Sequence, residues 1–144
     1  TLAILKEYDF PPSQLWIEIT ERCRDLPISM IKKTVTAFRE AGIHITMDDY
    51  GTGSSSSQMM LELPVEGIKI DMFFVNILEE KKKQALVIGM INFANAADLR
   101  ICIEGIENDS LESYLRQFDV TCFQGYHYSR PICQDELMKL LIKP

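Results

Sequence analysis

The stretch Ile43-His44-Ile45-Thr46-Met47-Asp48-Asp49-Tyr50-Gly51-Thr52-Gly53 joins an alternating, β-branched run to two adjacent carboxylates and a glycine-rich loop. The alternation predicts a strand over Ile43–Asp48. Because side chains alternate across a strand, Asp48 and Asp49 converge only if the backbone bends, and the glycines after them permit a bend. Two carboxylates aimed at one point suit a hard cation such as Mg²⁺ or Mn²⁺. Taken alone, the pattern is more typical of a strand end followed by a solvated Asp-Gly turn, and only the rest of the chain favours the cation site.

The composition sets limits on the kind of protein. A length of 144 residues with 47% hydrophobic residues suits one domain with a sizeable core. The sequence has no apolar run of membrane-spanning length and no signal-peptide pattern, so we expect a cytoplasmic domain without membrane contact. A net charge of −6 argues against a broad basic surface for a nucleic acid polymer. An anionic ligand would therefore need a local cation, a lysine or a helix N-terminus.

The cysteines and histidines show no metal-binding spacing. Cys102 and Cys122 lie in apolar, strand-like runs, which predicts buried, reduced thiols rather than disulfides or a zinc site. His44 and His127 are isolated in the sequence, and we expect each to be a packed or surface histidine rather than a ligand.

Strand-like and helix-like segments alternate along the chain, which predicts an α/β fold with a parallel sheet. Strands are expected at Leu15–Thr20, Ile43–Asp48, Gly67–Asp71, Arg100–Gly105 and Cys122–Tyr126. Helices are expected at about Pro27–Ala41, Ser56–Leu63, Met72–Leu78, Gln84–Leu99, Asp109 or Ser110 to Phe118, and Asp135–Ile142, with Thr1–Phe10 as the tail of an earlier helix.

Each expected strand carries a polar residue on the side opposite its aliphatic face. These residues are Glu18, Asp48, Lys69, Glu104 and Gln124. Central parallel strands are usually almost entirely apolar, so this repetition is unusual. If the aliphatic faces pack on helices, the polar side chains point into a barrel near its C-terminal mouth, where (β/α)₈ active sites lie. We therefore expect about five βα units of a (β/α)₈ TIM-type barrel.

A buried lysine needs a partner, since an unpaired buried charge is costly. One interpretation is that Lys69 pairs with Glu104 or Asp71 in a buried ion pair. The carboxylates of the other strands would then leave a surplus of negative charge, which a divalent cation would neutralise.

Five short motifs resemble those of the EAL domain, a family of bacterial cyclic di-GMP phosphodiesterases. They are Glu18-Ile19-Thr20-Glu21, Asp48-Asp49-Tyr50-Gly51-Thr52-Gly53, Lys69-Ile70-Asp71, Glu104-Gly105-Ile106-Glu107 and Gln124-Gly125-Tyr126. Their order and approximate spacing are similar to the family's from about Leu15 to Pro131. The resemblance implies a barrel that binds two divalent cations, Mg²⁺ or Mn²⁺, and hydrolyses cyclic di-GMP to linear 5′-pGpG in second-messenger signalling.

The resemblance also implies a role for each motif residue. Glu18, Asp48 and Asp49 resemble metal ligands. Glu104 resembles the carboxylate that acts on the attacking water, Lys69 a contact to that water or to the scissile phosphate, and Gln124 a member of the metal and water shell. The remaining motif residues resemble loop and supporting positions: Glu21, Glu107, Gly51, Thr52 and Gly53.

The chain departs from the family pattern in three places. Ser54–Ser57 stands where the family usually has Tyr-Ser-Ser-Leu, and Asn108 replaces the usual threonine. The Glu-Ala-Leu motif and a metal-binding asparagine are expected before Leu15, yet Thr1–Phe10 reads as helix. Residues 1–144 are thus expected to be the C-terminal part of an EAL domain, shorter than the ~250 residues typical of such barrels.

If residues 1–144 are only the C-terminal part of the domain, further expectations follow. The chain alone should be inactive, and its two exposed sheet edges, with an apolar patch around Trp16, predict a homo-oligomer. Sensor or GGDEF-type domains are expected elsewhere in the parent protein, which can be membrane-anchored. Two alternatives stay open: a catalytically silent EAL-type module that binds cyclic di-GMP or a protein partner, and a metal-dependent barrel of the enolase type.

Overall fold

The computed structural model describes residues 1–20, 26–52, 56–75 and 80–142. Its strands form one parallel sheet in the order β1 (Trp16–Ile19), β2 (His44–Tyr50), β3 (Gly67–Ile70), β4 (Arg100–Ile103) and β5 (Cys122–Phe123). The helices are α1 (Leu2–Glu7), η1 (Pro12–Gln14, a 3₁₀ turn), α2 (Ile28–Glu40), α3 (Ser56–Glu62), α4 (Met72–Val75), α5 (Lys81–Ala96), α6 (Asp109–Leu115) and α7 (Gln134–Leu141). The expected α/β fold is confirmed.

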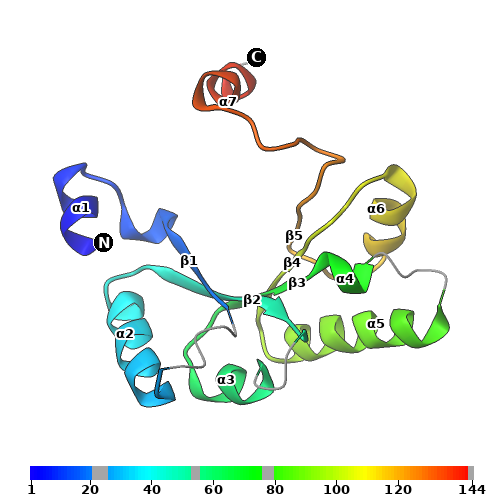
Figure 1. Ribbon diagram of the computed structural model, residues 1–144, viewed down its shortest axis with the longest axis horizontal. Helices are drawn as coiled ribbons and strands as arrows, with labels where there is room; N and C mark the ends of the chain where they lie inside the picture. Colours follow the sequence, from blue (N-terminus) through cyan, green and yellow to red (C-terminus); the bar gives the residue numbers. More distant parts are fainter. Residues whose placement is uncertain (21–25, 53–55, 76–79, 143–144) are drawn as a thin grey trace.

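The aliphatic face of the sheet forms the core. Ile45, Ile70 and Ile103 are fully buried on this face, and Figure 1 shows α2, α3 and α5 on one side of the sheet. Consecutive strands are parallel and adjacent, so every connection crosses the same face with a helix. The opposite face of the sheet carries Glu18 and Lys69 and lines a cleft. None of the described helices is both long and apolar enough to cross a membrane.

The structure corrects several expected boundaries. β2 runs on to Tyr50, because its register with β3 shifts after Met47 and pairing resumes at Tyr50. α5 begins at Lys81 rather than Gln84, and the turn η1 was not predicted. The N-cap of α6 is Asn108, whose side chain accepts a hydrogen bond from Leu111 N at 2.9 Å, rather than Asp109 or Ser110.

The last strand is much shorter than expected, since β5 ends at Phe123 instead of Tyr126. Beyond it the chain crosses the loop between β4 and α6. Ile106 N donates to Gln124 O at 3.1 Å, and His127 N donates to Ile106 O at 3.0 Å. Gly125 lies between these two bonds. A Cβ built there would overlap the backbone of Ile106, whose carbonyl carbon would be only 2.7 Å away.

This close approach predicts that Gly125→Ala is strongly destabilising. Backbone atoms of Ile106 cannot yield as a flexible side chain can, so we expect a loss of about 3 kcal/mol in the free energy of unfolding. Gly89→Ala is the matched control. Gly89 lies in α5 with nothing within 4 Å of an added Cβ, and alanine there should stabilise the fold by roughly 0.5–1 kcal/mol. Urea unfolding measures both, and equal midpoints for the two variants would contradict the assigned contact.

Candidate functional site

The backbone bends between the two adjacent aspartates. Asp49 has a φ of +54°, in the left-handed region that aspartate tolerates better than most residues. Thr52 fixes this turn, since its N and Oγ1 both donate to Asp49 O, at 3.1 and 2.9 Å. The bend lies at Asp49 itself, two residues before Gly51. It brings one oxygen from each of Asp48, Asp49 and Glu104 within 4.8 Å of one another.

Lys69, on β3, lies at the centre of the site. Its Nζ is 2.7 Å from Glu104 Oε1, 2.9 Å from Glu18 Oε1 and 3.4 Å from Asp48 Oδ1. The side chain is only 9% exposed. The suggested pairing with Asp71 is wrong, because Asp71 Oδ1 instead accepts a hydrogen bond from Phe73 N at 2.6 Å at the start of α4.

Electrostatics keep Lys69 charged. Burial opposes the charge, but hydrogen bonds to Glu104 and Glu18, helped by the nearby charges of Glu104 and Asp48, outweigh it and raise the pKa of Lys69 above its usual value. Asp48 Oδ1 is buried, and no described residue donates a hydrogen bond to it. Its 3.4 Å ion pair with Lys69 is therefore a charge interaction without a hydrogen bond. An under-satisfied carboxylate oxygen of this kind is where an additional cation would be stabilised.

The site opens into a cleft of about 390 Å³ on the inner face of the sheet. Its lining includes Trp16, Glu18, Thr46, Lys69, Arg100, Cys102, Thr121, Cys122 and Gln124. Both thiols in this lining are free, but the expectation of burial is only partly met by Cys102, which is half-buried, and is wrong for Cys122, which is exposed. Cys122 belongs to an edge strand whose outer side has no strand partner among the described residues. Burial, and then a hydrogen bond with Cys122, raise the pKa of the half-buried Cys102 thiol.

The supporting positions are only partly described. Glu21 and Gly53 lie outside the described residues. Gly51 has a φ of +94°, and a Cβ there would lie 3.3 Å from Phe74, so this loop packs tightly against α4. Thr52 holds the Asp49 turn, as described above. Glu107 is exposed on the loop that leads from β4 to α6.

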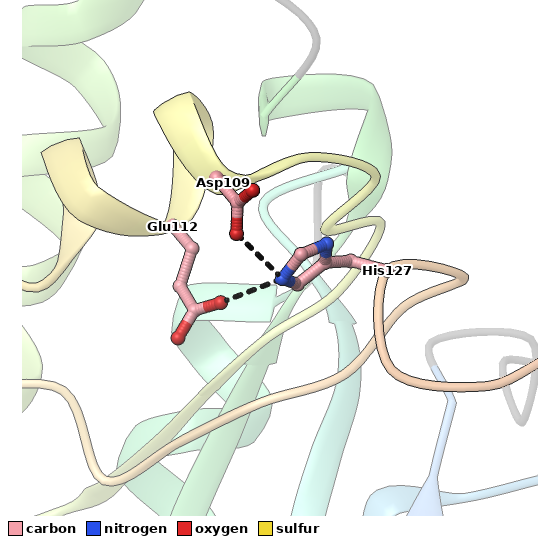
Figure 2. Close-up of side chains that lie close together, drawn as sticks. All are labelled: Asp109, Glu112 and His127. Atoms are coloured by element: carbon pink, nitrogen blue, oxygen red, sulfur yellow. Dashed lines mark ion pairs between the residues drawn. The ribbon is translucent and has the colours of Figure 1, made fainter.

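A second cluster, missed in the sequence, joins the segment after β5 to α6. His127 Nε2 lies 3.3 Å from Asp109 Oδ1 and 3.1 Å from Glu112 Oε2, and Figure 2 shows both carboxylates converging on this ring nitrogen. Arg116 Nε donates to Glu112 Oε1 at 2.6 Å, and this hydrogen bond lowers the pKa of Glu112. The sequence did contain one indication of this cluster, since the three-residue spacing of Asp109 and Glu112 places both carboxylates on one helix face.

Comparison with known proteins gives consistent matches. The family model of the EAL domain matches residues 1–131. The probable cyclic di-GMP phosphodiesterase PdeB of Escherichia coli K12 is 35% identical over 136 residues, which are 94% of this chain and 26% of PdeB.

Solved structures agree with the sequence matches. The EAL domain of Mycobacterium smegmatis DcpA is 31% identical, with a TM-score of 0.90 over 96% of this chain and 63% of that one. The phosphodiesterase PaMucR, solved in complex with c-di-GMP, is 27% identical, with a TM-score of 0.86 over 94% of this chain and 56% of that one. This chain spans only part of each relative. It belongs to the EAL domain family, and its five parallel strands are part of that family's TIM barrel.

Proposed function

We propose that the EAL domain containing this chain is a metal-dependent phosphodiesterase that hydrolyses cyclic di-GMP to linear 5′-pGpG. The observation that carries the proposal is the convergence of Asp48, Asp49 and Glu104 within 4.8 Å beside a buried, charged Lys69. The naming of PdeB as a probable cyclic di-GMP phosphodiesterase and the PaMucR complex with c-di-GMP support the choice of substrate.

The donor set fits a hard divalent cation. Three carboxylates, those of Glu18, Asp48 and Glu104, surround the Lys69 ammonium group, and Asp49 lies beside two of them. Oxygen ligands of this kind select Mg²⁺ or Mn²⁺ over softer metals. We propose that Glu18, Asp48 and Asp49 hold the metal, with the buried Asp48 Oδ1 as the oxygen that lacks a hydrogen bond. When bound, such cations lower the pKa of water and stabilise charge on a reacting phosphate.

The chain's own residues would supply the remaining chemistry. We propose that Glu104 accepts the proton of the attacking water, as a carboxylate held in place by Lys69 Nζ at 2.7 Å. The charge of Lys69 would stabilise the equatorial oxygens of the phosphate. Gln124, in the lining of the same cleft, would orient water or substrate through its amide.

Membership of the EAL family excludes the enolase-type barrel. The alternative of a catalytically silent EAL-type module remains. The domain could bind cyclic di-GMP or a protein partner without hydrolysing it. The observation that favours this reading is that Lys69 already neutralises Glu18, Asp48 and Glu104 in part without a metal. Incubation of the full-length parent with cyclic di-GMP and Mn²⁺ separates the two, since only the phosphodiesterase releases 5′-pGpG.

We predict that two substitutions in the complete domain impair different properties, one the catalytic rate and the other metal binding. Glu104→Gln should lower kcat by about 10²–10⁴-fold with little change in substrate affinity, because it removes the proton acceptor. Asp48→Asn should weaken metal binding instead and recover partly at high Mn²⁺. Glu80→Gln, an exposed carboxylate paired with Lys83, is the control and should keep full activity. Near-wild-type turnover by the Glu104 variant would remove Glu104 from the proposed mechanism.

We predict that Lys69→Met makes the fold dependent on metal. Removing the ammonium leaves partly buried carboxylates facing one another, which should cost about 3 kcal/mol in the free energy of unfolding. Mn²⁺ should restore part of this loss. The matched control is Lys83→Met, which breaks an exposed ion pair with Glu80 and should cost below ~1 kcal/mol. Thermal unfolding with and without Mn²⁺ measures both. A Lys69 variant of unchanged stability would show that the carboxylates do not need this cation.

We further propose that residues 1–144 are the C-terminal part of the domain and that this chain alone self-associates and lacks activity. Among the described strands, β1 and β5 are the sheet's outer strands, and unpaired edges promote association. On α7, Leu140 and Leu141 are exposed as well. Light scattering of the isolated chain should give a dimer or larger species. A monomer that hydrolyses cyclic di-GMP with Mg²⁺ would overturn both parts of the proposal.

A further inference from the structure

Two thiols lie side by side on the inner face of the sheet. Cys102 of β4 and Cys122 of β5 are direct partners in the parallel register, and both side chains line the same cleft. Neighbouring strands are about 4.8 Å apart, within the roughly 4.4–6.8 Å between Cα atoms that a disulfide spans. The two sulfurs can therefore be joined with little movement of the backbone.

The pair is accessible from the cleft. Both cysteines line it, with Cys122 exposed and Cys102 half-buried. A small oxidant that enters the cleft thus meets the more exposed Cys122 first, with Cys102 paired to it on the neighbouring strand. The other described cysteine, Cys133, is exposed at the N-cap of α7 and does not line the cleft.

The position of the pair connects it to the proposed active site. Cys102 lies two residues before Glu104 and Cys122 two residues before Gln124, so each thiol is one inward-facing position below a site residue. The ladder between β4 and β5 has only two residue pairs, Cys102 with Cys122 and Ile103 with Phe123. A covalent bond here would reinforce the shortest strand pairing in the sheet, directly beneath Glu104 and Gln124.

We propose that Cys102 and Cys122 form an oxidant-modified dithiol, which hydrogen peroxide or another small peroxide converts into a disulfide. The Cys122 sulfur attacks a peroxide oxygen and breaks the O–O bond, which gives a sulfenic acid and one water from hydrogen peroxide, or one alcohol from an organic peroxide. The Cys102 sulfur then attacks the sulfenic sulfur, which forms the S–S bond and releases the sulfenic oxygen as water. Peroxide gains the two electrons that the thiols lose. The proposal is independent of the hydrolytic activity.

The test is peroxide treatment of the purified chain, followed by peptide mapping by mass spectrometry. The wild type should lose two hydrogen atoms and yield one cross-linked peptide pair that contains Cys102 and Cys122, and dithiothreitol should reverse the change. Cys122→Ser and Cys102→Ser should each abolish the cross-link. Cys133→Ser and Cys23→Ser are the matched controls and should retain it. Since Cys122 is exposed, serine there should leave the fold intact.

A second readout tests the structural effect. Amide hydrogen exchange at Phe123 and Gln124 should slow by roughly tenfold or more in the oxidised wild type, because the cross-link suppresses separation of β5 from β4. Oxidised Cys122→Ser should show no slowing. Three results would overturn the proposal: sulfinic acid at Cys122 without a cross-link, disulfides between molecules only, or a cross-link through Cys133 or Cys23.

Discussion

The site depends on one buried ammonium, that of Lys69, which holds carboxylates from three other strands together. β3 is the middle strand of the sheet, so Lys69 reaches Glu18 and Asp48 on one side and Glu104 on the other. Without a cation, these acids would repel one another at such short range in a partly buried place. The same attraction raises the pKa of Lys69 and keeps the ammonium charged.

The two faces of the sheet explain how a charged centre can exist in a small fold. The period of two along each strand sends isoleucines into the helix-covered core and polar side chains to the other face. Asp49 would break this rule, since it follows Asp48 directly. Its left-handed backbone and the register shift after Met47 turn its carboxylate toward the same site. Local strain at a single residue thus adds an acid to the cluster.

Sequence periodicity predicted the features that depend on local alternation: the parallel α/β fold, the polar inner face and the need for a bend near Asp49. It failed for features that tertiary contacts determine, such as the length of a strand or the exposure of a side chain. β5 is short because Gly125 packs on the Ile106 backbone, a contact between segments distant in sequence. Cys122 is exposed because β5 is an edge strand. The pairing of His127 with α6 required the fold of both loops to be known.

The proposed site consists of two groups of residues, each held by its own contacts, and Lys69 contacts both groups. Glu104 and Gln124 belong to one group, since the loop after Glu104 and the segment after Gln124 are joined through the Ile106 backbone and the His127 ion pairs. Asp48 and Asp49 belong to the other, held by the Thr52 turn. Lys69 contacts a member of each. A change in either group therefore alters the charges around the other, both through Lys69 and through the direct approach of Asp48 and Asp49 to Glu104.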